Sequence, residues 1–426
     1  MNQTILVIGA GPAGATASAL LRQRGYRVIV IEKQHFPRFS IGESLLPQCM
    51  EILEEAGMLE TVKANADRLS FQFKNGAAFK QGERYTDFNF GEKFTPGLGW
   101  TWQVRRGDFD KLLADSAAAQ GTEIRYGHEI LTVDISGDTP VVTIRGEDGT
   151  SYTETPSFVL DASGFGRILP RLLNLEVPSN FPVRRAIFTH VMDHISDPVF
   201  DREKIRVTVH PEENHVWWWL IPFSDGRASV GVVACEEFFA KYQGTSEERW
   251  RAILAEDEGL STLLAQSTVC QEVRELGGYS ADVKSLYGRH FALLGNAGEF
   301  LDPVFSSGVT IAMKSASLCV PLLDRQLQGE TIDWENDYEK TLRRGITVFR
   351  AYVEAWYDGS FQDIIFSPKQ SPEIKAMICS LLAGYAWDEK NPFNRDAKRR
   401  LSTITEICRD TSIETDALLT MEGTTP

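Results

Sequence analysis

The chain has 426 residues, of which 42% are apolar and 24% charged, a composition typical of a globular protein and not of a disordered one. This length exceeds a single hydrophobic core, so one large domain with a second layer, or two interleaved domains, is expected. The net charge of -15 argues against nucleic acid or an anionic membrane surface as a partner, because both attract basic surfaces.

The N-terminus and the cysteines predict a cytosolic protein with neither a membrane span nor a metal site. The first residues enter an apolar strand directly, without the basic region and longer apolar run of a signal peptide. Apolar runs elsewhere fall short of the roughly 20 residues of a membrane helix. The six cysteines are scattered, with no C-x-x-C pair and no histidine cluster nearby, so free thiols are expected.

A βαβ unit at the start of the chain predicts a dinucleotide-binding fold. Residues 5–31 contain a short apolar strand, an Ala-rich amphipathic helix and a second apolar strand. Gly9, Gly11 and Gly14 form a G-x-G-x-x-G pattern between the first strand and the helix. Such glycines allow a tight turn and close approach of a pyrophosphate, whose charge the helix N-terminus favours. Glu32, at the end of the second strand, is positioned to accept the ribose hydroxyls of adenosine.

The rest of the chain predicts an inserted sheet and a helical C-terminal region. Helices are expected at 44–57 and 108–119, strands at 71–79, 99–104 and 158–160, and hairpins between 123 and 152. Apolar residues recur with period two at 186–192, 205–210, 216–222 and 228–234, which predicts a mostly antiparallel sheet. The chain returns to the first domain at 291–294, forms a helix at 307–323, and is helical from about 334, with breaks at Gly359, Pro368 and Pro392.

We therefore expect an α/β fold, a Rossmann-like nucleotide-binding domain with an inserted substrate-side sheet. The expected boundaries are 1–180 for the first domain, 181–285 for the inserted sheet, 286–330 for the return to the first domain and 331–426 for the helical region. Strands within 70–104 are expected to join the substrate layer.

Three further segments carry distinctive patterns. Residues 36–47 read FPRFSIGESLLP, residues 217–222 read WWWLIP and contain W-x-W-x-I-P, and Lys74 lies in the strand-like stretch before Asn-Gly. Together they resemble the flavin-dependent halogenases, within the FAD-dependent monooxygenase superfamily. Tryptophan halogenases have a glutamate where this chain has Phe305. The resemblance therefore points to the branch that acts on pyrroles, phenols or carrier-bound rings.

The resemblance implies FAD as the cofactor. Arg106 looks like the family arginine that contacts FAD, and residues 295–298 followed by Asp302 resemble the second FAD signature. Asn296 departs from that signature, which usually has an acidic residue there, but its amide can still donate or accept a hydrogen bond. The expected FAD-binding residues are Gly9, Gly11, Ala13, Gly14, Glu32, Lys33, Arg38, Glu43, Ser44, Arg106, Asp161, Gly164, Gly295, Asn296, Asp302, Gly308 and Val309.

The resemblance also implies where halide and substrate bind. Ser307 and Gly308 match the halide-binding turn of the family, and free amides at a helix start favour an anion. Lys74 matches the lysine that orients or captures hypohalous acid, and an ammonium in an apolar tunnel has a lowered pKa. The substrate pocket is expected to be lined by Trp217, Trp219 and Phe305.

The residue patterns leave simpler interpretations open. A lysine before Asn-Gly is typical of a solvated turn, and Arg106 of an exposed helix start. Ser44 could cap the helix expected after it, and alternate tryptophans could simply be sheet core. The same fold serves flavin monooxygenases, geranylgeranyl reductase-like enzymes, and flavoproteins that hold FAD without catalysis.

The reaction that the resemblance implies is the FADH2- and O2-dependent halogenation of an electron-rich aromatic ring through hypohalous acid, with chloride or bromide as the halide. Because the sequence has no second dinucleotide motif, a separate flavin reductase is expected to supply reduced FAD. The expected substrate is a small aromatic molecule, free or tethered to an acyl carrier protein.

Overall fold

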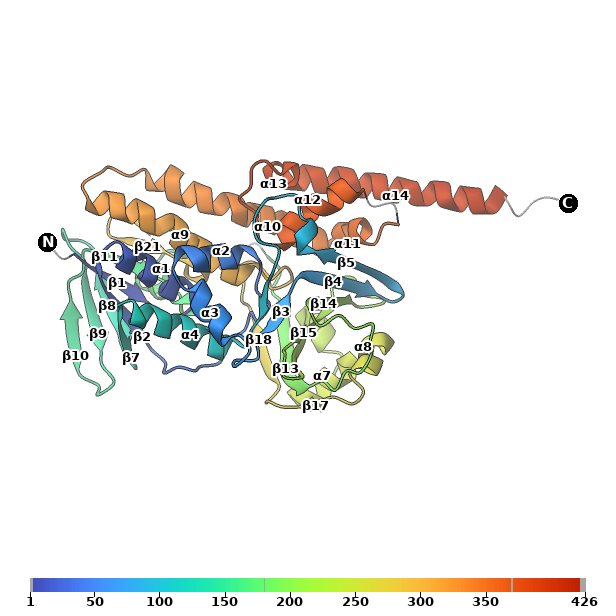
Figure 1. Cartoon of the computed structure of the whole chain (residues 1–426), viewed down its shortest axis with the longest axis horizontal. Coiled ribbons are helices and arrows are strands. Elements are labelled where there is room, and N and C mark those ends of the chain that lie inside the picture. Colours follow the sequence, from blue (N-terminus) through green and yellow to red (C-terminus); the bar gives the residue numbers. More distant parts are fainter. Residues whose placement is uncertain (1–2, 180, 369–370, 422–426) are drawn as a thin grey trace.

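The computed structural model describes residues 3–179, 181–368 and 371–421. Within these residues, a six-stranded sheet forms one end of the molecule, a sheet built around β13–β16 forms the other, and the C-terminal helices run along both (Figure 1). The predicted Rossmann-like fold with an inserted, mostly antiparallel sheet is confirmed. The domain boundaries themselves stay predictions.

The six-stranded sheet carries the nucleotide-binding unit. Its order is β20-β21-β11-β1-β2-β7, parallel except where β20 meets β21. Every residue from Ile5 to Ile8 is almost fully buried, as expected for a central parallel strand covered on both faces. The strands are β1 (Thr4–Ile8), β2 (Arg27–Glu32), β7 (Glu123–Tyr126), β11 (Phe158–Asp161), β20 (Tyr287–Gly288) and β21 (Phe291–Leu293). The helices packed together beside it are α1 (Pro12–Gln23), α4 (Arg106–Ala119) and α9 (Ser307–Leu327).

The helix predicted to start at Ser44 begins later, so that prediction is wrong at its N-terminal end. Helix α2 spans Gln48–Glu55 and is followed by α3 (Leu59–Asn65). Ser44 instead forms a bridge to Gln103 of β6 (Thr101–Gln103). Pro47 precedes α2, and a proline disfavours helical backbone in the residue before it. Residues 44–46 therefore run beside β6, where Ser44 is free to contact another side chain.

The single strand predicted at 71–79 is two strands in different sheets, so that prediction is also corrected. β3 (Gln72–Lys74) pairs with β6, whereas β4 (Gly76–Gln81) pairs with β5 (Arg84–Asn89) and β14 (Lys204–Val209). The chain passes from one sheet to the other just before Gly76. A Cβ atom at Gly76 would lie 2.2 Å from the Phe88 carbonyl oxygen, so this position requires glycine. Lys74 consequently lies at the junction of the two sheets.

The second large sheet has the order β17-β13-β16-β15-β14-β4-β5, with β18 also paired to β13, and only β14 and β4 are parallel. Trp217 and Trp219 of β15 pack into the main core, while Trp218 packs into a separate core on the other face. That face is covered by α6 (Glu236–Phe239), α7 (Ser246–Leu254) and α8 (Glu258–Leu263). The remaining strands are β13 (Arg185–Met192), β15 (Trp217–Pro222), β16 (Arg227–Ala234), β17 (Thr268–Val269) and β18 (Arg274–Gly277).

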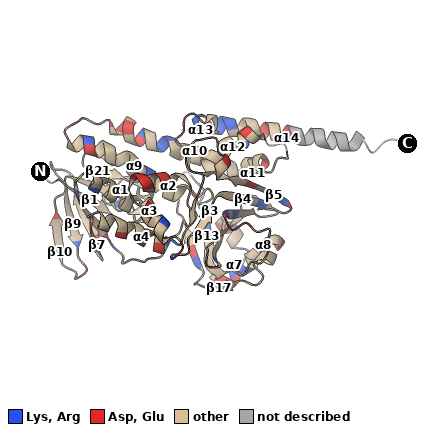
Figure 2. Ribbon diagram, in the orientation of Figure 1, with Lys and Arg blue, Asp and Glu red and all other residues tan. Residues whose placement is uncertain are grey.

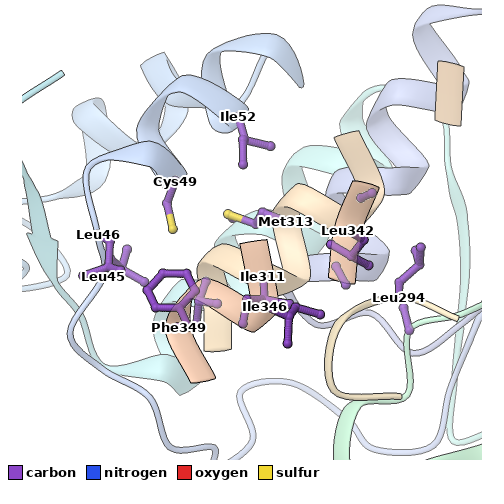
Figure 3. Close-up of a cluster of buried hydrophobic side chains, with 14 of the residues drawn as sticks. Leu45, Leu46, Cys49, Ile52, Leu294, Ile311, Met313, Leu342, Ile346 and Phe349 are labelled. Atoms are coloured by element: carbon purple, nitrogen blue, oxygen red, sulfur yellow. The ribbon is translucent and has the colours of Figure 1, made fainter. Parts of the chain in front are cut away.

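The helical layer joins the two sheets. Figure 3 shows Leu45, Leu46 and Cys49 facing Ile311 of α9 and Phe349 of α10. Acidic and basic residues are interspersed along this layer (Figure 2). Its helices are α10 (Thr341–Tyr357), α11 (Ser360–Ile365), α12 (Pro372–Leu382), α13 (Pro392–Arg395) and α14 (Ala397–Met421). Smaller elements are β8 (Glu129–Asp134), β9 (Val141–Arg145), β10 (Ser151–Glu154), α5 (Ile168–Leu172), and β12 (Glu176–Val177) paired with β19 (Asp282–Val283).

Candidate active site

The loop between β1 and α1 has backbone geometry that requires glycine at two positions. Gly9 has a φ of +93°, and a Cβ atom there would lie 2.7 Å from the Ala162 carbonyl oxygen. A Cβ atom at Gly14 would lie 1.9 Å from the Gly9 carbonyl oxygen. The nearest atom to a Cβ at Gly11 is Nη2 of Arg38, at 3.4 Å. The loop therefore faces a guanidinium group, and α1 begins without a side-chain cap, so its first amides stay available to an anion.

The acidic residue at the end of β2 is tied to this loop. Glu32 is buried and accepts a hydrogen bond from the Ala10 amide at 2.9 Å. Arg38 lies between two carboxylates, with Nε 3.9 Å from Glu32 Oε1 and Nη1 3.4 Å from Asp110 Oδ2. Lys33, in contrast, lies on the surface in an ion pair with a glutamate of β8. The structure brings Glu32 and Arg38 together with the glycine loop, but not the ammonium of Lys33.

Arg106 is buried, so the alternative of an exposed helix-start arginine is wrong. Its Nε and Nη2 donate to the two carboxylate oxygens of Asp110 at 2.8 and 3.0 Å, and Nη1 donates to the Ile41 carbonyl at 2.6 Å. The next residue after Ile41 is Gly42, whose φ of +100° lies in the region that favours glycine. A bidentate pair of this kind fixes the guanidinium plane, so Arg106 holds the turn that leads into the Glu43–Pro47 segment.

Glu43 is paired with a histidine that sequence reasoning missed. His190 of β13 lies with Nε2 2.9 Å from Glu43 Oε1, and both side chains are buried. Nδ1 of His190 is buried without a hydrogen-bond partner among the described residues. The sequence around His190 contains no motif that would single it out, because it is one residue in a period-two strand far from Glu43 in the chain. This pair ties the substrate-side sheet to the segment in which Glu43 and Ser44 are expected to bind FAD.

Lys74 is completely buried, so the alternative of a solvated turn lysine is wrong. Its Nζ donates to Ser44 Oγ and to the Leu45 carbonyl, both at 2.7 Å, and lies 5.2 Å from the centre of the Phe90 ring. Burial in this apolar setting lowers the pKa of Lys74 to about 7. Ser44 is thus a hydrogen-bond partner of Lys74 and not a helix cap.

Cys49, in the first turn of α2, contacts the start of α9. Its Sγ is 3.1 Å from Thr310 Oγ1 in the first turns of α9. Burial raises the pKa of the Cys49 thiol, so it stays neutral. Cys49 therefore joins α2, which follows the Ser44–Leu45 segment bound by Lys74, to the helix that begins at the predicted halide turn.

The start of α9 offers uncapped backbone amides. Ser306 precedes the helix with a φ of +56° and its side chain makes no capping hydrogen bond. Ser307 is buried, and a Cβ atom at Gly308 would lie 3.1 Å from the Phe300 ring and 3.9 Å from Asn296 Oδ1. Asn296 Oδ1 is buried and has no hydrogen-bond partner among the described residues. The Asn296 side chain therefore faces Gly308, and its amide oxygen can accept a hydrogen bond from a bound molecule.

Asp161 and Asp302 are further buried carboxylates among the predicted FAD residues, beside Glu32 and Glu43. Asp161 accepts from the amides of Ser163 and Leu169 at 2.9 and 2.6 Å, and Asp302 accepts from the Val304 amide at 3.0 Å. Burial raises the pKa of both side chains, that of Asp302 to about 6. The remaining predicted residues are Ala13, buried in the first turn of α1, Gly164 (φ +59°), Gly295 (φ +54°) and Val309, buried in the first turn of α9.

The residues predicted to line the substrate pocket are packed aromatic side chains. Phe305 and Trp217 both contact Trp356, with ring centres 6.0 and 6.3 Å apart. Trp219 lies 6.1 Å from Trp217 and covers Gly231, where a Cβ atom would come within 2.3 Å of the indole. The three predicted residues thus form one aromatic wall on the face of the sheet that meets the main core.

Comparison with known proteins decides the family. The sequence model of the FAD-binding domain family matches residues 2–339. The flavin-dependent halogenase armH1 of Armillaria mellea is 30% identical over 78% of this chain and 67% of its own length. The chain belongs to the flavin-dependent halogenases. A 1H-pyrrole-2-carbonyl peptidyl-carrier-protein chlorinase of Pseudomonas fluorescens is 27% identical to this halogenase, over 94% of this chain and 93% of its own.

A solved structure of a flavoprotein/dehydrogenase from Cytophaga hutchinsonii is also similar to this halogenase. It is 44% identical, superposes with a TM-score of 0.92, and the match covers 96% of this chain and 99% of the other. Fold and sequence thus agree that the halogenase is an FAD-dependent enzyme.

The residues present in this halogenase fit FAD. The glycine loop keeps an open side toward Arg38, Glu32 lies beside that loop, and the Asn296 oxygen lacks a partner where the second FAD signature places a polar contact. No group of His, Cys, Asp and Glu in the described part of the chain could hold a metal ion. Across the same residues, every helix is too short or too polar to cross a bilayer.

Proposed function

We propose that this protein uses reduced FAD, dioxygen and chloride or bromide to halogenate an electron-rich aromatic ring of the pyrrole or phenol type. The observation that carries the proposal is Lys74, a fully buried lysine whose amine is held by Ser44 and Leu45 and whose pKa is lowered to about 7. The similarity to a chlorinase of a carrier-bound pyrrole favours a substrate tethered to an acyl carrier protein.

Lys74 is suited to orient a small electrophile. Two of its N–H groups are fixed by Ser44 and Leu45, which leaves a third for a guest molecule. When bound, reduced FAD supplies the oxygen chemistry that converts halide to hypohalous acid. The apolar surroundings of the ammonium, including Phe90, exclude water, which strengthens its hydrogen bond to that acid and limits the loss of the acid to solvent.

The start of α9 and the aromatic wall complete the proposed site. The amides of Ser307 and Gly308 would hold the halide, since the helix has no side-chain cap to compete for them. Trp217 and Trp219 would keep the aromatic substrate on the Lys74 side, away from FAD. Reduced FAD would come from a separate flavin reductase.

The test is product analysis with a matched pair of variants. The protein is incubated with FAD, a flavin reductase, NADH and bromide, together with pyrrole, phenol and indole compounds, free and carrier-bound, and products are identified by mass spectrometry. Lys74→Met removes the amine while filling the same space, so halogenated product should fall by more than about a hundredfold. Oxygen consumption, which depends on FAD and not on Lys74, should persist.

Lys80→Met is the control. Lys80 lies on β4, close to Lys74 in the chain, but lines a separate surface hollow of about 760 Å³ with Arg206 and Glu258. Its removal should leave halogenation unchanged. If Lys74→Met keeps more than about a tenth of the parent rate, a loss in barrier terms under about 1.4 kcal/mol, the lysine has no part in the mechanism.

A second candidate is a flavin-dependent oxidoreductase that uses no halide. The similarity to a flavoprotein/dehydrogenase at 44% identity favours it. The same incubation separates the two functions, because a halide-free oxidoreductase gives an oxidised or reduced product whose yield does not depend on bromide.

A further inference from the structure

Tyr357, the last residue of α10, links two parts of the site that are distant in sequence. Trp217 Nε1 donates to the Tyr357 hydroxyl at 3.0 Å, and that hydroxyl donates to Asp302 Oδ2 at 2.9 Å. Asp302 Oδ1 accepts from the Val304 amide. A chain of hydrogen bonds thus runs from the W-x-W-x-I-P strand to the loop that leads into α9.

Both ends of this chain, Trp217 and Asp302, are buried, which makes the loss of their partner costly. Asp302 is 2% exposed and Trp217 is 1% exposed. A buried carboxylate or indole N–H that loses its partner keeps its desolvation cost without compensation. The Arg184 guanidinium lies 3.2 Å from the centre of the Tyr357 ring and holds that ring from its face. The hydroxyl of Tyr357 is therefore fixed between its donor and its acceptor.

The loop from Asp302 to Ser306 needs such a tether. Ser306 adopts a left-handed φ of +56°, a conformation that costs a non-glycine residue of order 1 kcal/mol or more and persists only where surrounding contacts enforce it. The amides of Ser307 and Gly308 follow directly, so the orientation of those amides depends on how firmly this loop is held.

We propose that Tyr357 is a positioning residue for the halide turn: it fixes the loop before α9 relative to the Trp217 indole, and so sets the affinity of the Ser307 and Gly308 amides for halide. This role rests on the proposed function. The positioning role of Tyr357 also assigns a function to the Trp-Tyr-Asp-Gly segment at 356–359, which lies outside the FAD motifs.

The chain offers a matched control on the same helix. Tyr352 is fully buried and packs against Phe305, which lies in the loop before α9, with ring centres 6.2 Å apart. Its hydroxyl, however, has no hydrogen-bond partner among the described residues. Tyr352→Phe therefore removes a hydroxyl without breaking the chain, whereas Tyr357→Phe breaks it.

The experiment titrates bromide into the FAD-loaded protein and each variant, following the flavin absorbance, and measures the bromide KM and kcat of halogenation. Tyr357→Phe should weaken bromide binding and raise the bromide KM by at least about tenfold, with a smaller change in kcat. Tyr352→Phe should change each value by less than about twofold. FAD content and the thermal midpoint are measured alongside, to show that both variants are folded.

Equal bromide affinities for the two variants would overturn the role of Tyr357. A second measurement uses Trp217→Phe and the double variant. Because both changes break one chain, their combined effect on bromide affinity should be clearly smaller than the sum of the single effects, and full additivity would also overturn the proposal. If the unaltered protein halogenates no substrate, the proposed function fails, while the bromide titration still decides whether Tyr357 controls the turn.

Discussion

Replacing Lys74 by methionine should change how the stability of the fold depends on pH. The amine is completely buried, with a pKa of about 7 in the folded protein against an ordinary value of 10.5. Between these two values the unfolded chain binds a proton that the folded chain does not. The free energy of unfolding therefore rises with pH across this window, and the stability that Lys74 contributes is lost as pH falls from about 10.5 to about 7.

The structure sets the size of this effect. A pKa that falls from 10.5 to about 7 corresponds to roughly 4–5 kcal/mol between the protonated and neutral forms, an upper bound for a buried group. From pH 7 to pH 10 the expected change is about 3 kcal/mol. Methionine leaves Ser44 Oγ and the Leu45 carbonyl without the lysine donor, which costs about 1–3 kcal/mol at every pH and does not alter the slope.

The assay is urea unfolding of the FAD-free protein and of Lys74→Met at several pH values from 7 to 10. The difference in unfolding free energy between the two should shift by about 3 kcal/mol across the range, with the methionine variant relatively more stable at the lower pH. Lys80→Met controls for the loss of a lysine close to Lys74 in the chain but on another sheet, and should give a difference that hardly depends on pH. A constant difference for Lys74→Met would show that the lysine titrates normally and would remove the basis for its proposed role.

Two further predictions concern glycines. In Gly11→Val the added side chain pushes against the Arg38 guanidinium and occupies the open side of the loop, so FAD affinity measured by fluorescence should fall at least about tenfold, and wild-type affinity would show that FAD does not bind there. In Gly231→Ala the new Cβ would lie 2.3 Å from the Trp219 ring, so the indole must move. Thermal unfolding should show that the folded state loses about 1–3 kcal/mol of stability, and halogenation should drop. An unchanged thermal midpoint would contradict the packing described for Trp219.

The sequence alone was sufficient for the nucleotide-binding unit. The glycine pattern, the two apolar strands and Glu32 are close together in the chain, and their geometry depends on local backbone preferences that each residue carries with it. Period two likewise predicted the strands of the inserted sheet, because alternation of side chains is a property of a single strand. The FAD-dependent class followed from the resemblance of the nucleotide-binding motifs to the FAD-dependent monooxygenase superfamily, and the W-x-W-x-I-P and Lys74 segments marked the resemblance to halogenases.

The surroundings of the chemical groups depended on tertiary structure. Whether Lys74 is a solvated or a buried amine was open in the sequence, since a lysine before Asn-Gly is usually exposed; the switch between sheets at Gly76 buries it against Ser44 and Leu45. Pro47 delays α2 and so frees Ser44 for that contact. These outcomes depend on neighbours brought together by folding and not on the residues beside them in the chain.

The pairs formed across the fold carry no local signal at all. Glu43 meets His190 across 147 residues, and Trp217 meets Tyr357 across 140. A single histidine in a strand or a single tyrosine at a helix end is compatible with many environments, and its partner is selected only when the two sheets and the helical layer pack together. The sequence determined which chemical groups the protein has and the local elements that bear them, whereas the packing of those elements decided which groups are desolvated and which meet, because burial and long-range contacts are properties of the assembled fold.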